Sequence, residues 1–346
     1  MRARDRPRVG LGAEPEFRRS HSGARLSPCD VVLILAFGLM PLAGNAQDLP
    51  PRAIHIIVPS PPGAASDISA RLIGQKLSES LRQPVVVENQ GGASGAIGMS
   101  MLRRAAPDGA TIGVVIALAQ TIDRIQNKKA SFDIVEDFTP ITAIANNPAG
   151  LVVNPRIAAT SLTAFVDLVR NHPREISYAS GGIGTAHHLY GQILNRTAGI
   201  EMLYVPYKGV APALNDLLGG HVPAAIVSLT TALPHIQSGQ LRLLTVFDTK
   251  RYPKLPDVPT ITVEMPEVVP GRTWIGLLGP PNLPATISAR LHEQVVRILN
   301  SPDVQHVLSD NGLETIGNTP SDFAAMIKED AKIWDAAAAS VGLLGQ

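Results

Sequence analysis

The sequence has little of what thiol chemistry, nucleobase stacking or a strongly charged surface would require. Of its 346 residues only Cys29 is a cysteine, aromatic residues make up 4%, and charged residues make up 17%. One cysteine excludes an internal disulfide framework, and so few aromatic side chains argue against a surface that stacks bases. The charged fraction lies below the roughly 25% of an average soluble domain, which favours sheets that are buried on both faces.

The few charges are unevenly distributed. Residues 1–46 contain seven arginines and four acidic residues, which leaves 23 basic and 25 acidic side chains in the remainder of the chain. The remainder is close to neutral, so it lacks the basic footprint that nucleic-acid binding requires. We therefore expect no nucleic-acid partner.

A predicted targeting segment accounts for the clustered arginines. An apolar run covers residues 31–42 and is followed by the string AGNA at 43–46. The run is shorter than the ~20 residues of a membrane-spanning helix, and its arginine-rich, apolar, small-residue order predicts a secretory signal that is cleaved after Ala46. Cys29 would leave with this signal, so the exported chain is expected to begin at Gln47 and to contain no cysteine.

Beyond residue 47 short apolar segments alternate with amphipathic ones. Apolar residues at 68, 72, 73, 77 and 81 follow helical spacing and predict a helix over 66–81. Repeated units of this kind predict parallel sheets that are covered by helices. The neighbouring elements that we expect are strands at 54–59, 85–88 and 112–117 and a helix at 96–105.

The string NNP at 146–148 divides the apolar stretches 141–145 and 150–153, and we interpret it as a crossing into a second lobe. A proline-rich stretch over 252–270 leads back through a strand at 274–278. We therefore predict an α/β fold with two lobes, 47–147 plus 272–346 and 148–271, separated by a cleft that a hinge can close. The further elements expected are helices at 162–171, 185–198, 212–218, 287–299, 302–310 and 321–340, and strands at 177–179, 202–205, 224–227 and 241–247.

The loop that follows the first predicted strand is a candidate anion site. It reads PSPPGAASD over 59–67, where prolines restrict its path and Gly63 permits close backbone approach. The helix N-terminus that comes next carries about half a positive charge and favours a carboxylate. Asp67 can either select an amine or hydroxyl of the ligand or only cap the helix. The candidate ligand-binding residues in this loop are Ser60, Pro62, Gly63, Ala64, Ser66 and Asp67.

A second loop, YASGGIGTAHHL over 178–189, has the same strand–glycine loop–helix plan in the other lobe. Two helix N-termini that face each other across a cleft can hold the two ends of a dicarboxylate, although on spacing alone a tight turn with nothing bound is the favoured explanation of the glycines. Tyr207, in the string VPYKG, either lines the cleft or packs beside it. The candidates in the second loop are Ser180, Gly182, Gly184, Thr185 and His188.

Catalytic and metal-binding patterns are weak. Ser180, His188 and Asp67 can be written as a triad, but no G-x-S-x-G elbow supports it. The adjacent His187 and His188 point to different helix faces, and no H-E-x-x-H or cysteine cluster is present. The glycines at 92, 95 and 98 lack the G-x-G opening of a dinucleotide site. We predict a protein that is not an enzyme and that needs neither a cofactor nor a metal ion.

The chain resembles the periplasmic solute-binding proteins of tripartite tricarboxylate transporters, the Bug family. The matching strings include IIVPSPPGAASDISARLIGQKLSESLRQPVVVEN, ISYASGGIGTAHHL, VPYKGVAPALNDLLGGHVPAAI and IGLLGPPNLPATISARLHEQVVRILNSPDV. They occur in the family's order and cover about residues 51–343. The resemblance implies a type II periplasmic-binding-protein-like fold, a small carboxylate held between the lobes by loops 59–67 and 180–188, a membrane permease as partner, and a monomer in the periplasm.

The chain departs from the family pattern at several positions. Ser60 stands where an aromatic residue is usual, and Ala64 stands where a second glycine is usual. The segment 117–124 lacks the usual small polar start, for which Gln120 can compensate. These departures leave the ligand open: a C4 dicarboxylate is the first expectation, with aromatic carboxylates, amino acids and nicotinate-like acids as alternatives. A sensor subunit that presents its ligand to a membrane kinase would use the same cleft, so this role stays open as well.

Overall fold

The computed structural model describes residues 49–92, 95–127 and 131–344, which belong to one compact unit, Gln47–Gln346. The predicted signal, its cleavage after Ala46 and Cys29 lie outside the described residues. In the described part no helix has the length and apolar character that crossing a bilayer requires.

The first sheet contains six strands in the order β11-β4-β10-β3-β1-β2. The strands β1, β2 and β3 are parallel, β10 is antiparallel to β3 and to β4, and β11 pairs with the free edge of β4. The bounds are β1 (Ile54–Val58), β2 (Val85–Asn89), β3 (Thr111–Ile116), β4 (Thr139–Asn146), β10 (Trp274–Gly279) and β11 (Glu314–Thr315).

The second sheet contains five strands in the order β7-β6-β8-β5-β9. Here β6, β7 and β8 are parallel, whereas β5 is antiparallel to both β8 and β9. The bounds are β5 (Ala149–Val153), β6 (Ser177–Ser180), β7 (Leu203–Pro206), β8 (Ala224–Ser228) and β9 (Arg242–Val246).

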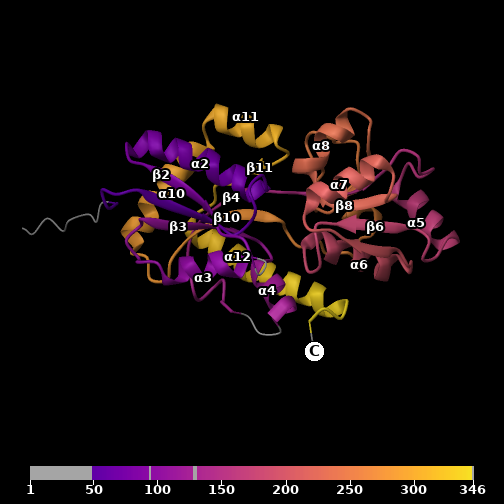
Figure 1. Cartoon of the computed structure of the whole chain (residues 1–346), viewed down its shortest axis with the longest axis horizontal. Coiled ribbons are helices and arrows are strands. Elements are labelled where there is room, and N and C mark those ends of the chain that lie inside the picture. The colour runs from indigo at the N-terminus through magenta and orange to yellow at the C-terminus, as the bar shows by residue number, and fades with distance from the viewer. Residues whose placement is uncertain (1–48, 93–94, 128–130, 345–346) are drawn as a thin grey trace, which may run out of the picture. The chain divides into compact units, whose positions relative to one another are not determined.

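Helices cover both faces of each sheet (Figure 1). Alternate strand residues face opposite layers: in β1 the side chains of Ile54 and Ile56 pack with α2 and α10, whereas Ile57 packs with α3. In the second sheet α7 and α8 cover one face and α5 and α6 the other. The helix bounds are α2 (Ala65–Leu81), α3 (Ala96–Arg104), α4 (Ala119–Asn127), α5 (Leu162–Asn171), α6 (Ala186–Ala198), α7 (Val210–Gly219), α8 (Leu229–Gln237), α9 (Ile261–Glu264), α10 (Ala285–Leu299), α11 (Pro302–Asp310) and α12 (Pro320–Ser340).

The sheets are mixed, so the prediction of parallel sheets was wrong for β5 and β10. The chain passes from β4 to β5 through two residues, Asn147 and Pro148, and returns to the first sheet at β10. Each of these two strands enters its sheet from the end at which the parallel strands stop. A strand that enters from that end has to run against its neighbours, and β-α-β spacing alone gives no sign of it.

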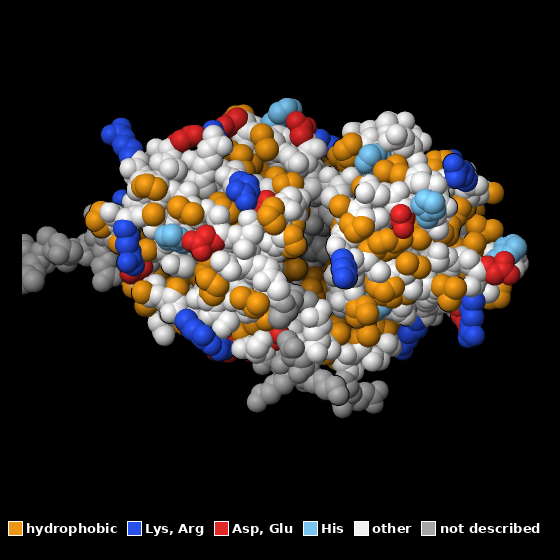
Figure 2. Space-filling model, viewed as in Figure 1, with side chains coloured by type: hydrophobic (Ala, Val, Ile, Leu, Met, Phe, Trp, Pro, Cys, Tyr) orange, Lys and Arg blue, Asp and Glu red, His pale blue; other side chains and the backbone are white. Residues whose placement is uncertain are grey.

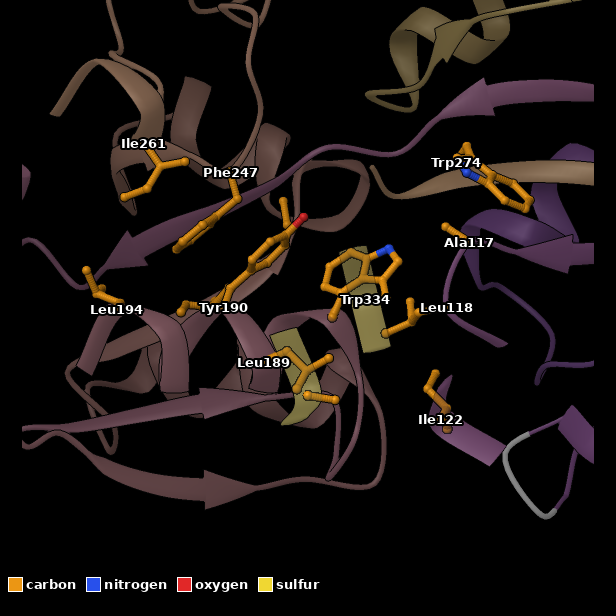
Figure 3. Close-up of a cluster of buried hydrophobic side chains, with 14 of the residues drawn as sticks. Ala117, Leu118, Ile122, Leu189, Tyr190, Leu194, Phe247, Ile261, Trp274 and Trp334 are labelled. Carbon is orange, nitrogen blue, oxygen red and sulfur yellow. The ribbon is translucent and has the colours of Figure 1, made fainter. Parts of the chain in front are cut away.

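The C-terminal helix α12 joins the two halves of the core. It packs on β4 and α4 beside the first sheet and on α6 beside the second. Its Trp334 is fully buried, with its ring 5.3 Å from that of Tyr190, which in turn stacks on Phe247 at 4.4 Å. Figure 3 shows Trp334 between Tyr190 and Leu118, which follows β3. Helix α12 therefore provides apolar packing that links elements of both sheets.

The chain returning to β10 is fixed against the same helix. Trp334 Nε1 donates to the carbonyl of Arg272 at 3.0 Å, and Tyr190 Oη donates to that of Gly271 at 2.6 Å. Asp330 accepts from Arg272 Nε at 3.0 Å and from Trp274 Nε1 at 2.7 Å. Backbone and side-chain groups of 271–274 are thus held by α6 and α12 where β10 begins.

Replacing Gly271 with alanine should destabilise the fold. A Cβ at this position would lie 2.4 Å from Cε2 of Trp334, so the indole or the returning chain must shift, at a cost of about 1–3 kcal/mol. Urea unfolding measures this loss. Gly91→Ala is the matched control because its added Cβ meets its nearest neighbour, the Ser60 carbonyl carbon, at an ordinary 3.7 Å. Equal stability of the two variants would contradict the proposed packing constraint.

Candidate functional site

A cavity of about 450 Å³ lies where the loops that follow the parallel strands of both sheets meet. Figure 2 shows a groove near the centre of the drawn face, with mostly uncharged side chains along its edges. The first sheet contributes loops after β1 and β3, and the second sheet contributes loops after β6, β7 and β8. Asn147 and Thr273, on the two segments that pass between the sheets, also line the cavity.

The first turns of several helices open into this cavity. Lining residues include the N-cap or first residues of α2, α4, α6, α7 and α8. The first backbone N–H groups of a helix have no intrahelical acceptor, and the helix end carries about half a positive charge. Several such ends around one cavity create a positive potential and a set of N–H donors, which suits an anion.

Side-chain charge in the lining is limited to one lysine. Among the described residues that line the cavity, none is Asp, Glu or Arg, and the titratable ones are Lys208 and His187. Lys208 is exposed and has no carboxylate partner in the described part of the chain. No group of three His, Cys, Asp or Glu residues in the described ranges is arranged to hold a metal ion. The cavity therefore offers positive potential without a buried ion pair.

Loop 59–66 reaches the cavity in a conformation that its glycine and prolines set. Gly63 has a positive φ of 82°, in the left-handed region that glycine adopts readily. Ala64 is the N-cap of α2 and provides no side-chain cap. The hydroxyl groups of Ser60 and Ser66 lie 2.7 Å apart and form a hydrogen bond. The result is a loop that presents backbone amides, hydroxyl groups and proline rings.

Asp67 lies behind this loop and is 3% exposed. Its carboxylate accepts hydrogen bonds from Gly63 N at 2.9 Å, Arg71 Nε at 3.0 Å and Asn89 Nδ2 at 2.9 Å. Burial alone would raise the pKa of the Asp67 carboxyl, but these hydrogen bonds and the Arg71 charge outweigh burial and lower the pKa. The contacts favour a role in holding the loop; contact of Asp67 with a ligand stays a prediction.

Helix α3 supports the same loop from the other side. A Cβ at Gly98 would lie 2.8 Å from the carbonyl oxygen of Gln90 and 3.2 Å from Cα of Pro59, and Gly95 has a positive φ of 94°. These two glycines therefore allow α3 to approach the backbone at the start of the loop. The glycines at 95 and 98 serve close packing here.

The second loop is organised by its N-cap. Thr185 Oγ1 donates to the carbonyl of Gly182 at 2.8 Å and accepts from His188 N at 3.3 Å. His188 Nδ1 accepts from Gly184 N at 3.2 Å, and its ring stacks on Tyr204 at 4.1 Å. His188 is thus buried behind the loop, and its neighbour His187 lines the cavity.

The predicted site residues fall into two groups. Six line the cavity: Ser60, Pro62, Gly63, Ala64, Ser66 and Thr185. Seven do not: Asp67, Gln120, Ser180, Gly182, Gly184, His188 and Tyr207. Of these, Gln120 accepts from Ile134 N, Ser180 pairs with Tyr204 Oη, and Tyr207 Oη donates to Asp216. Ligand contacts stay a prediction for both groups.

Sequence reasoning missed several polar residues of the lining. These are Asn147, His187, Lys208, Ser228, Thr230, Thr231 and Thr273. Ser228 carried a local sequence signal, since serine is a favoured N-cap residue. In the structure it caps α8, and its Oγ accepts a hydrogen bond from Thr230 N at 3.2 Å. Asn147 and Thr273 carried no local sequence signal, because their position depends on how the two segments that connect the sheets meet.

His187 is a neutral polar group of the cavity wall. It is partly buried, it has no hydrogen-bond partner among the described residues, and burial lowers its pKa to about 4. An imidazole that is neutral at physiological pH can both donate and accept a hydrogen bond.

Comparison with known proteins identifies similar chains. The model of the family described as "Tripartite tricarboxylate transporter family receptor" matches residues 69–343. Protein BugT of Bordetella pertussis is 32% identical over 292 residues, which are 84% of this chain and 89% of BugT. The structure of R. palustris Rpa4515 with adipate has a TM-score of 0.78 at 31% identity, covering 85% of this chain and 99% of that one. MatC from Rhodopseudomonas palustris with bound malate has a TM-score of 0.73 at 28% identity, covering 83% and 99%.

Removing the Asp67 carboxylate should loosen the loop at 59–66. Asp67→Ala leaves Gly63 N, Asn89 and Arg71 without their shared acceptor, and we expect the free energy of unfolding to fall by about 2–4 kcal/mol. Chemical unfolding without ligand measures this. Asp257→Ala, at an exposed position, is the control. Unchanged stability with loss of ligand affinity would instead indicate direct ligand contact by Asp67.

His187 should make the fold sensitive to acid. Its pKa is about 4 in the folded chain against ~6.5 when unfolded, so between these values the unfolded state binds more protons and stability rises with pH. We expect acidification from pH 6.5 to 4 to cost the wild type about 1–3 kcal/mol more than His187→Gln. Urea unfolding at several pH values measures the difference. The exposed-site variant His221→Gln should follow the wild type, and identical pH profiles for all three proteins would contradict the assignment.

Proposed function

Because the chain belongs to the tripartite tricarboxylate transporter receptor family, we propose that it captures a small organic acid outside the cytoplasm and delivers it to the membrane permease of such a transporter. The observation that carries the proposal is the cavity itself. Helix N-termini surround it and no acidic side chain lines it among the described residues. Relatives with adipate and malate in their structures support an organic acid as the ligand.

The physical basis of capture is charge compensation by backbone groups. A carboxylate that leaves water needs hydrogen bonds to replace those it loses. First-turn N–H groups of α2 and α6, together with one hydroxyl of the Ser60–Ser66 pair, are placed on the cavity wall to supply them. Lys208 at the exposed edge adds a positive charge that attracts the acid.

Closure would proceed between lobes 47–147 plus 272–346 and 148–271. The support for these boundaries is that every strand of the first sheet lies in the former residues and every described strand of the second sheet in the latter. Rotation about the segments at 147–148 and 271–273 would bring the helix N-termini of both lobes onto the ligand.

The remaining parts of the proposal concern location and chemistry. We infer a periplasmic protein, exported by the signal at 1–46 and cleaved after Ala46, that acts as a monomer. We infer no catalytic role, because the described lining offers His187 and Lys208 as its titratable groups and no carboxylate to orient either of them. N-terminal sequencing of the protein from its native host should give Gln47, and finding Met1 on that protein would contradict export through a cleaved signal.

A thermal-shift screen tests the binding role. Residues 47–346 should be stabilised by adipate, malate or a related acid, since ligand at 100 times its Kd adds about 2.7 kcal/mol. A panel of aliphatic, hydroxy and aromatic carboxylates covers the expected range. If no carboxylate raises the unfolding temperature, the proposed ligand class is wrong.

A charge placed at the N-cap of α2 gives a sharper test. Ala64 has N-cap geometry but no side chain that can cap, so Ala64→Asp should stabilise the ligand-free protein by about 0.5–2 kcal/mol. The same carboxylate would occupy the anion site, and acid binding should be lost. Ser301→Asp, at the N-cap of α11 and outside the cavity, is the control that adds equal charge. Retained binding in Ala64→Asp would place the acid elsewhere.

A further inference from the structure

Asn147 occupies the short segment between β4 and β5 and lines the cavity. Its Oδ1 accepts hydrogen bonds from two hydroxyl groups of the second lobe, Ser228 Oγ and Thr230 Oγ1, the latter at 2.8 Å. Ser228 Oγ also accepts from Thr230 N, so its hydroxyl hydrogen is free to point at Asn147. In this arrangement the Oδ1 end of the amide faces the two hydroxyl groups, and the Nδ2 end points away from them.

The backbone of Asn147 is tied to the other passing segment. Asn147 N donates to the carbonyl of Thr273 at 3.1 Å, and Thr273 Oγ1 donates to the carbonyl of Asn147 at 2.7 Å. Asn147 is therefore held by its side chain to α8 and by its backbone to the strand that returns to the first sheet. Its position is set from both directions.

This arrangement leaves the Asn147 amide nitrogen without a protein acceptor. Among the described residues no hydrogen bond from Asn147 Nδ2 is formed, and the residue is only partly buried because it faces the cavity. When a ligand displaces water from the cavity, an unpaired N–H₂ group costs free energy unless the ligand brings an acceptor. The group therefore selects for an oxygen at this point.

The strand order places Asn147 and loop 59–66 at different parts of the cavity. The loop follows β1 and Asn147 follows β4, and β3 and β10 lie between these two strands in the first sheet. The chain that follows β3 therefore lines the cavity between the two polar regions.

The lining between the two regions is apolar on the side of the first lobe. The end of β3 and the start of α4 contribute Ile116, Ala117, Leu118 and Ala119. These side chains offer no hydrogen bonds, so they suit methylene groups or a ring better than a hydroxyl-rich body.

We propose that Asn147 is the second anchor of the cavity, and that the ligand is an elongated acid with a carboxylate at loop 59–66, an apolar middle beside 116–119 and an oxygen acceptor on Asn147 Nδ2. The inference rests on the proposed function, since it assigns the ligand of that same site. A straight-chain diacid longer than four carbons has this chemistry, whereas a monoacid of equal length lacks the second acceptor.

Titration calorimetry with a matched pair of acids tests the proposal. Adipate and hexanoate have the same chain length and differ in the second carboxylate, and succinate, glutarate and pimelate vary the length. The wild type should bind adipate at least ~10-fold more tightly than hexanoate and more tightly than succinate. Asn147→Ala should weaken adipate binding by ~10-fold or more and change hexanoate binding by less than about twofold.

Two further variants separate ligand contact from structure. Asn147→Asp keeps an oxygen for Ser228 and Thr230 but replaces the N–H₂ donor by a negative charge, so it should retain the unfolding temperature and lose adipate more than hexanoate. Asn300→Ala, at the exposed end of α10, should change neither.

The outcomes distinguish the two proposals. If no acid of the series or of the wider panel binds the wild type, the proposed function fails, and this inference fails with it. If adipate binds the wild type but Asn147→Ala weakens both acids equally, or neither, the assignment of Asn147 is overturned while the binding role stands. Tightest binding of succinate would overturn the elongated ligand.

Discussion

The constraint on which the structure depends is that an anion must be held in a cavity with little side-chain charge. In the described lining only Lys208 carries a full positive charge, and it lies at the exposed edge. Backbone N–H groups at the starts of α2, α4, α6, α7 and α8 have to supply the rest. They can do so only because the parallel strands of both sheets end at the cavity, so that the loops and helices that follow them begin there.

The segments that pass between the sheets connect them and also line the cavity. They enter each sheet from the cavity end, which makes β5 and β10 antiparallel to their neighbours and places Asn147 and Thr273 on the cavity wall. Helix α12 fixes the returning segment through Trp334 and Asp330. Groups that we propose to contact the ligand and groups about which the proposed lobes would turn are therefore neighbours, so that occupancy and closure can be coupled without a distant relay.

Much of the layered α/β fold followed from sequence patterns, because each amphipathic helix and apolar strand carries its own period. Loop 59–66 could also be predicted locally, because proline, glycine and a helix start occur together in the sequence, and the structure places it on the cavity wall. Residues whose position depends on tertiary contacts were not found. His187 and His188 are equivalent as a string, and only the hydrogen bond from Gly184 N to His188 and its stacking on Tyr204 decide which one faces the cavity. Helix α8 was also missed, since Pro234 lies inside it. The place of Asn147 on the cavity wall could not be predicted, because it depends on tertiary contacts with residues 228–230 and 273.

The central claim is that enclosed backbone groups compensate the charge of the acid. The salt dependence of adipate binding tests this claim most directly. Calorimetry of residues 47–346 with adipate at 50 and 500 mM NaCl spans Debye lengths from above 10 Å to a few ångströms. Interactions inside a closed cavity are screened far less than those between exposed charges. We predict that the affinity falls by less than about fivefold. A fall of a hundredfold, abolished in Lys208→Gln, would show that an exposed lysine rather than the helix N-termini holds the acid, and would contradict the account.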